Sequence, residues 1–468
     1  MSISEASAST ADGLDAGDDD PVDHSRPVDH SALSRTTTLG RQLLVGFALV
    51  ALIYAVSPNS DGSDGYLAIP AAHSLYHDAD LDLSEFRDAD WFSTHYALID
   101  VEGRSVDYFP WLTAVAAVPV VAAWEALSWT GITRDPGDMV AEASFTRLRI
   151  LSASLISALA ATLLGLLAFR LVQLAGNGRR TAVSWLAIDG RWTVTTWIVV
   201  IGLGTSLWSI ASRSTWQHGP SVALGAAAML MLVAALREQR NGPWFAACAG
   251  ALVSLAYWAR PTNVVLTLVL CGVLAARRPR LLVAAGAAVV GAHALVVATN
   301  LALLGTALPP YFTASRVGWH GDLPEALAAN MISPARGLLV FSPFLLGAAA
   351  LLLPSRRAIL GRDLGTYALV AGLGAAGYLV VVSAFGEKWW AGHSFGPRFM
   401  TETLVLLAPL ALIGIFGPRA ASPPPRRAGR TLAVLAIGWS VLVHMTGAHV
   451  PSTSCWNGIP EDIDTAPQ

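Results

Sequence analysis

The amino-acid sequence predicts an all-α, polytopic membrane protein, and three observations lead to this class. Of its 468 residues, 54% are apolar and only 13% are charged, about half of the roughly 25% charge that is typical of a soluble domain. A soluble protein of this length could not bury so much apolar surface in its core. The third observation is that long runs without any charge recur along the chain.

These runs predict the individual helices. A helix needs about 20 apolar residues to span a bilayer, and twelve runs come near this length. They are 43–57, 109–124, 150–169, 192–212, 219–236, 243–259, 261–276, 281–304, 337–355, 364–386, 403–418 and 431–448. We therefore predict a bundle of about eleven to thirteen transmembrane helices in a single domain over residues 41–468.

Residues 1–40 differ from the rest of the chain. They are rich in Ser, Thr, Asp and Gly, hold eight acids and two Arg, and lack an apolar face to bury. We expect a disordered, cytoplasmic tail. The first apolar run begins only near Gln42, too late for an ordinary signal peptide, so we expect it to remain as the first transmembrane helix.

The polar joins between the runs fall into two sets. One set holds sixteen Arg and only three acids, so the positive-inside rule places it on the cytoplasmic side of the membrane. We expect this membrane to be the plasma membrane. The other set holds Trp, His and isolated cations and belongs on the outer face. Because the outer joins are chemically varied and the inner ones are uniformly basic, we expect the function on the outer face.

The sequence offers little for a metal or a cofactor. Its three Cys form no CxxC pair, which excludes a disulfide framework and a structural zinc of that type. His73 and His77 have the i, i+4 spacing of metal ligands on a helix, but the acids after them also fit a solvent-facing segment. We expect no cofactor and no nucleic-acid partner, and a divalent metal is the alternative.

Two acids follow the first apolar run, in the stretch Pro-Asn-Ser-Asp-Gly-Ser-Asp-Gly-Tyr at 58–66. Asp61 and Asp64 fit turn or cap positions, for which Asp is well suited. They also fit a general base held at the membrane surface, where a lipid-linked substrate presents its headgroup.

Two short polar motifs in the middle of the chain contain candidate binding residues. Trp216 and His218 lie in Trp-Gln-His-Gly-Pro, a tight outer turn whose lone His is either structural or part of a binding site. Arg260 stands between two apolar runs, which is costly unless the side chain is paired or reaches water. It either extends to the headgroups or grips a phosphate, for which its planar guanidinium is well suited.

The strongest signal lies at 387–398, in the stretch Glu-Lys-Trp-Trp-Ala-Gly-His-Ser-Phe-Gly-Pro-Arg. Interfacial anchoring explains its two Trp but not its glycines and clustered cations. The candidates are Lys388, which is the only Lys in the chain, with Trp390, His393 and Arg398. A second outer motif, Ser-Pro-Ala-Arg-Gly at 333–337, adds Arg336. None of the charge-free runs contains an acid paired with a cation, which argues against a proton-coupled transporter.

The order of these motifs resembles that of the GT-C superfamily of membrane glycosyltransferases, especially the dolichyl-phosphate-mannose protein mannosyltransferase-like group, family 39. The resemblance rests on the acids after the first helix, Trp-Gln-His-Gly-Pro, the Arg-Pro break, Ser-Pro-x-Arg-Gly and Trp-x-Gly-x-Ser-x-Gly-Pro-Arg. It spans residues 41–460 loosely, and its last two motifs are the specific ones.

The resemblance implies inverting transfer of a sugar from a polyprenyl-phosphate donor to a glycan, lipid or protein acceptor on the exterior face. It makes Asp64 the expected catalytic base, with Asp61 as the alternative. The expected ligands of the donor phosphate are Arg260, Arg398, Lys388 and Arg336. The expected substrate-binding residues are Trp216, His218, Trp390 and His393. The alternatives are a transporter or flippase for lipid-linked saccharides and a membrane subunit of an envelope-assembly complex.

The same resemblance makes 57–107, which holds eleven acids and two Arg, an acidic first exterior loop. An odd number of crossings must then separate this loop from the inner join at 170–191, but hydropathy shows two runs between them. Either 109–124 lies in the membrane interface or a short crossing is hidden.

Overall fold

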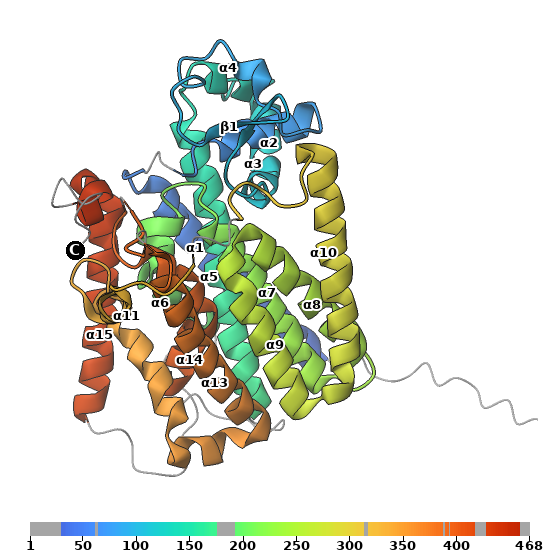
Figure 1. Ribbon diagram of the computed structural model, residues 1–468. Coiled ribbons are helices and arrows are strands. Elements are labelled where there is room, and N and C mark those ends of the chain that lie inside the picture. The colour runs from blue at the N-terminus through green and yellow to red at the C-terminus, as the bar shows by residue number, and fades with distance from the viewer. Residues whose placement is uncertain are drawn as a thin grey trace, which may run out of the picture.

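The computed structural model describes residues 30–60, 64–175, 192–312, 317–386, 389–392, 394–416 and 427–458, and it is mostly helical. In these ranges eight helices are long and apolar enough to cross a membrane, and they form one bundle (Figure 1). They are α1 (His30–Val56), α5 (Thr146–Ala175), α7 (His218–Arg237), α8 (Gly242–Ala259), α10 (Leu282–Leu304), α13 (Pro354–Ser383), α14 (Leu404–Phe416, after the 3₁₀ turn Arg398–Thr403) and α15 (Arg427–His449). The chain is therefore a multi-pass membrane protein, as predicted.

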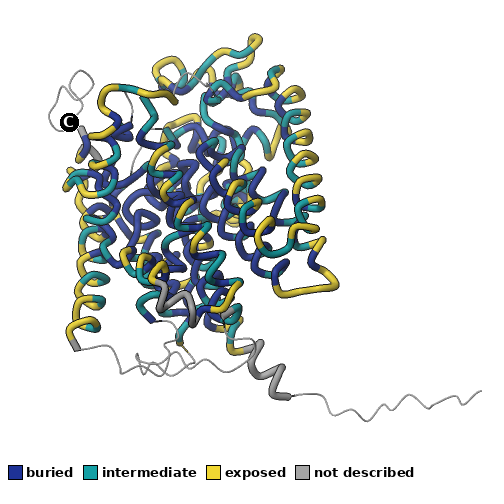
Figure 2. Tube along the Cα trace, turned by 60° about the horizontal axis from the view of Figure 1, so that its bottom comes forward, coloured by how far each residue is buried: buried dark blue, intermediate teal, exposed yellow. Residues whose placement is uncertain are grey.

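The outward-facing surface of the bundle is apolar. Figure 2 shows buried chain in the middle of the molecule and exposed residues along its outer helices. On α10 and α15 the exposed side chains include Val290, Leu295, Leu432 and Leu435. Soluble proteins rarely expose apolar surface of this extent, so these faces are suited to contact with lipid.

In the described ranges, eight of the predicted eleven to thirteen membrane helices are found as long apolar helices, and four further apolar helices are shorter than a bilayer crossing. They are α3 (Leu112–Ser128), α6 (Thr193–Leu203), α9 (Val264–Arg277) with the turn Pro261–Asn263 before it, and the 3₁₀ helix Pro343–Leu352, which follows α12 (Leu338–Phe341). Pro261 and Pro343 stand at two of the breaks, because proline has no N–H with which to continue a helix.

Residues 64–145 form a cap over one end of the bundle (Figure 1). The cap contains α2 (Ala68–His77), α3, α4 (Pro136–Ala141) and an antiparallel hairpin of β1 (Leu98–Val101) and β2 (Arg104–Asp107). It has its own apolar core, which includes Ile69, Phe86, Trp91 and Phe145. The all-α prediction missed the hairpin, whose turn residues Glu102 and Gly103 both have positive φ, as a two-residue type I′ turn requires.

The place of α3 removes the conflict in the number of crossings. Its buried residues Ala114, Ala117 and Val121 belong to the core of the cap. The run 109–124 is therefore a cap helix, and α5 leads alone from the cap along the bundle. The Arg-rich joint between α9 and α10 lies at the end opposite the cap (Figure 1).

The beginning of α1 corrects the predicted length of the disordered tail. The helix begins at His30, so residues 30–40 are helical, because extending an existing helix costs much less than nucleating a new one. Residues 1–29 lie outside the described ranges.

Candidate functional site

A buried arginine fixes the end of α1 and so the start of the segment that carries Asp64. Arg213 donates from Nη1 to the carbonyls of Ser57 (2.8 Å) and Asn59 (3.1 Å), and from Nη2 to that of Tyr54 (2.5 Å). A cation that bonds the last carbonyls of a helix satisfies acceptors which have no partner within the helix.

We expect Arg213→Met to lower the unfolding free energy by about 3 kcal/mol, because it leaves three buried carbonyls without this donor. Thermal unfolding of the purified protein in detergent measures the change. Arg87→Met, at an exposed position of the cap, is the matched control and should leave the melting temperature within about 1 °C of the wild type. Equal melting temperatures for the two variants would contradict the capping role.

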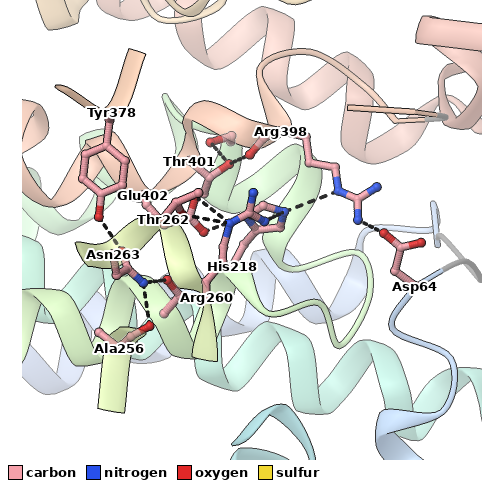
Figure 3. Close-up of polar contacts among 12 residues, drawn as sticks. Asp64, His218, Ala256, Arg260, Thr262, Asn263, Tyr378, Arg398, Thr401 and Glu402 are labelled. Atoms are coloured by element: carbon pink, nitrogen blue, oxygen red, sulfur yellow. Dashed lines mark hydrogen bonds and ion pairs between the residues drawn. The ribbon is translucent and has the colours of Figure 1, made fainter. Parts of the chain in front are cut away.

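Asp64 lies where the cap meets the bundle and is bonded from two sides. Its carboxylate accepts hydrogen bonds from the guanidinium of Arg398 (Figure 3) and from the hydroxyl of Tyr96. Burial alone would raise the pKa of Asp64, but the charge of Arg398 and these hydrogen bonds hold it below its ordinary value. Asp64 is therefore ionised at neutral pH.

Gly65, the residue after Asp64, lies against the turn before α7. A Cβ at this position would be 2.6 Å from Ser214 Oγ and 2.8 Å from the backbone carbon of Thr215, and Thr215 Oγ1 donates to the carbonyl of Gly65 (2.6 Å). Only glycine allows so close an approach, so the pair Asp64-Gly65 is explained by packing against the mid-chain turn.

Arg398 is held by two residues of another predicted motif, Trp-Gln-His-Gly-Pro. Its Cζ lies 4.2 Å from the centre of the Trp216 ring, and its Nε lies 3.4 Å from Nε2 of His218. Trp216 is almost fully buried and packs against this guanidinium. Its predicted contact with substrate is therefore not supported, and its role here is to position Arg398 by a cation–π contact.

Behind Arg398 lies a fully buried charge network (Figure 3). His218 Nδ1 lies 2.8 Å from Glu402 Oε1, and Arg260 Nε lies 3.4 Å from Glu402 Oε2. Arg260 Nη1 also lies 3.1 Å from His218 Nε2. Arg260 Nη1 is almost as close to Nδ1 (3.2 Å), so it lies over the ring. Because a carboxylate only accepts hydrogen bonds, we infer that the ring donates from Nδ1 to Glu402 and accepts at Nε2 from Nε of Arg398. His218 thus links Glu402 to Arg398 and is too deeply buried to meet a substrate.

The predicted Arg-Pro break is confirmed, but Arg260 does not have the surroundings of a phosphate ligand. The side chain is 3% exposed and faces the carboxylate of Glu402, so it neither extends to the headgroups nor presents its guanidinium to a ligand. A buried cation needs such a counter-charge. Asn263 completes the break by donating from Nδ2 to the carbonyl of Ala256 (2.7 Å) and to Ser221 Oγ (2.6 Å).

Glu402 is the site residue that the sequence reasoning missed. The sequence does contain a signal for it, because Glu402 is an acid directly before the charge-free run 403–418. It lies four residues after Arg398, the last residue of the motif at 387–398. Glu402 and Arg260 both stand just outside charge-free runs, so the observation that no such run contains a paired acid and cation still holds. Their pair forms between the runs, within the bundle.

Arg336 and Trp390 form a neighbouring cluster. Arg336, which follows α11 (Leu323–Ile332), lies with its Cζ 5.2 Å from the centre of the Trp389 ring, and its Nη1 donates to the carbonyl of Trp390 (3.4 Å). Trp390 is 2% exposed, so its ring packs in this cluster and its predicted contact with substrate is not supported. Asp61, Lys388 and His393 lie outside the described ranges.

Packing within the cap explains the spacing of His73 and His77. Their rings lie 4.4 Å apart, and His77 Nε2 lies 2.8 Å from Glu125 Oε2 on α3. The described residues contain no group of three or more His, Cys, Asp or Glu side chains arranged to hold a metal ion.

The fold and these contacts define a multi-pass membrane protein with a charged network where the cap meets the bundle. No protein-family model, curated protein or solved structure matches the chain. The proposal of a function therefore rests on the chemistry of these residues.

Proposed function

We propose that the protein is a GT-C-type glycosyltransferase that moves a sugar, with inversion, from a polyprenyl-phosphate donor to an acceptor hydroxyl at the outer face of the cell membrane. The observation that carries this proposal is the ion pair between Asp64 and Arg398, where the polar cap meets the apolar bundle. A prenyl chain in the membrane would present its phosphate and sugar at this level.

The two side chains have complementary roles. Asp64 takes the proton of the acceptor hydroxyl while that oxygen attacks the anomeric carbon. The bond from the anomeric carbon to the phosphate oxygen breaks, and the lipid phosphate leaves with the electron pair. The guanidinium of Arg398 stabilises the growing charge of the phosphate.

In this scheme Arg398 pairs in turn with Asp64 and with the donor phosphate. Arg398 is bonded to Asp64, so a donor phosphate competes with Asp64 for the same guanidinium. When Arg398 turns to the phosphate, Asp64 loses its counter-charge and becomes a stronger base. His218, Glu402 and Arg260 are positioning residues that support Arg398 from behind.

The Arg-rich joint between α9 and α10, at the end opposite the cap, supports an orientation in which the cap faces outward. By the positive-inside rule that end lies in the cytoplasm, together with the N-terminus, and the cap lies outside.

The test is transfer by the purified protein in detergent, with radiolabelled polyprenyl-phosphate mannose, glucose, galactose and arabinose as donors and cell-envelope lipids and glycans as acceptors. We expect a labelled product from at least one donor and none from Arg398→Ala. Failure of every donor in the presence of every acceptor fraction would overturn the proposal.

The buried Glu402–Arg260 pair favours a second candidate, because charged pairs inside a membrane bundle often mark transport pathways. A transporter for lipid-linked saccharides would hold the headgroup with the same residues and break no bond. In proteoliposomes such a protein would move labelled donor across the bilayer, and in detergent it would form no product. Product formation without a sealed membrane therefore excludes a pure transporter.

A further inference from the structure

The hairpin of the cap places another carboxyl group, that of Asp107, near Tyr96, which bonds Asp64. Asp107 ends β2 opposite Leu98 of β1, and Tyr96, whose hydroxyl bonds Asp64, lies two residues before Leu98. Asp107 and Tyr96 therefore lie at the same end of the hairpin, and the charge of Asp64 acts on both. In the described part of the chain, the carboxyl of Asp107 has one hydrogen bond, from the N–H of Phe109 to Oδ1 (3.0 Å).

The surroundings of the two carboxyls favour opposite protonation states. Burial raises the pKa of Asp107, and the negative charge of Asp64 raises it further, against the opposing effect of the Phe109 N–H, to about 8. Asp64 is ionised, because Arg398 faces it. With Asp107 protonated at neutral pH, this end of the hairpin offers a hydrogen-bond donor, and Tyr96 at the same end bonds the acceptor, ionised Asp64.

The ring of Tyr96 supplies an apolar surface next to these groups. Tyr96 is 63% exposed, although its hydroxyl is fixed on Asp64. His95 stacks on it at 5.1 Å between ring centres, and Tyr66 stacks on His95 at 4.9 Å. This stack holds the Tyr96 ring in one orientation.

We propose that Asp107, Asp64 and Tyr96 form a subsite for a saccharide acceptor with vicinal hydroxyls. The attacking hydroxyl donates to Asp64, the neighbouring hydroxyl accepts from Asp107, and the apolar face of the sugar ring packs on Tyr96. This inference rests on the proposed function and narrows it, because a peptide or simple lipid hydroxyl lacks the neighbour that Asp107 recognises.

Binding without catalysis is the first test, since it does not depend on a donor. Saturation-transfer NMR is recorded in detergent with a panel of methyl glycosides of hexoses and pentoses, and with octanol as a monohydric control. We expect saccharide signals from the wild type, their loss in Asp107→Ala and Tyr96→Leu, and their retention in Asp107→Asn, whose amide also donates. The absence of a signal from every glycoside, or an unchanged signal in Asp107→Ala, would overturn the subsite.

Kinetics with the same glycosides as acceptors is the second test. Asp107→Ala should raise the KM for the saccharide about three- to ten-fold and leave the KM for the donor unchanged. Equal changes in both KM values would overturn the subsite and leave the transfer reaction standing. Saccharide binding without transfer from any donor would overturn the proposed function instead.

The pH dependence separates the donor role of Asp107 from a purely structural one. The titratable groups that face Asp107 are Asp64 and Tyr96. The wild type should bind saccharide less well as the pH rises through about 8, because Asp107 then loses the proton that it donates. Asp107→Asn has no such proton to lose and should show no decline in this range. A parallel decline in both proteins would contradict the donor role.

Discussion

Asp64→Asn should reduce the rate of glycosyl transfer by about 10²–10⁴-fold, the range in which a positioned general base contributes. The substitution keeps the shape of the side chain and removes its charge. It should also tighten the binding of a lipid phosphate without sugar, such as farnesyl phosphate, by roughly two- to ten-fold. The reason is that Arg398 is then no longer paired with a competing carboxylate. Single-turnover transfer and equilibrium binding in detergent give the two values.

Slower transfer together with tighter binding of farnesyl phosphate is expected only if Asp64 and the phosphate compete for Arg398. Asp88→Asn, at an exposed position of the same cap, is the matched control and should change neither value. If Asp64→Asn kept full activity, the base assignment would fail. If its activity fell while the affinity for farnesyl phosphate also fell, competition for Arg398 would be excluded.

Glu402→Leu should lower the unfolding free energy by about 3–5 kcal/mol, the cost of leaving the partner of a buried ion pair without compensation. Arg260 would then lie inside the bundle without the carboxylate that faces it (Figure 3). Thermal unfolding in detergent measures this effect. The double variant Glu402→Leu/Arg260→Leu should recover most of the loss, because both charges are then absent.

The double variant also separates stability from positioning. His218 would lose the carboxylate that fixes its ring, so Arg398 would be less well held and transfer should remain slow although the protein is stable. Glu142→Leu breaks an exposed pair with Arg134 and is the control, with an expected cost below about 1 kcal/mol. Similar melting temperatures for Glu142→Leu and Glu402→Leu would show that the buried pair is unimportant for stability.

The membrane class, the approximate positions of the helices and the break at Arg260-Pro261 were predictable from local patterns. Hydropathy is summed over consecutive residues, so the preference of a charge-free run for lipid can be calculated from that run alone. The position of α3 was not predictable in this way, because an apolar helix can be buried in a cap or in a membrane with the same composition.

The site was predictable only as a set of candidates. Asp64, Trp216, His218, Arg260 and Arg398 were all selected from their motifs, and the structure brings them together. The partners of each could not be assigned, since an isolated cation in an apolar chain suits a phosphate and a carboxylate equally. Glu402 supplies that carboxylate to Arg260, which moves Arg260 from the expected phosphate ligands to the support of Arg398.

The sequence by itself determined that this chain is a helical membrane protein with few charges, and it determined which of those charges stand at the ends of apolar runs. Only the tertiary structure decided which charges meet. Asp64 and Arg398 are 334 positions apart, and the hairpin of the cap places Asp107 at the same end as Tyr96, which bonds Asp64. The preference of a segment for lipid depends on its own residues, whereas an ion pair depends on how distant segments pack.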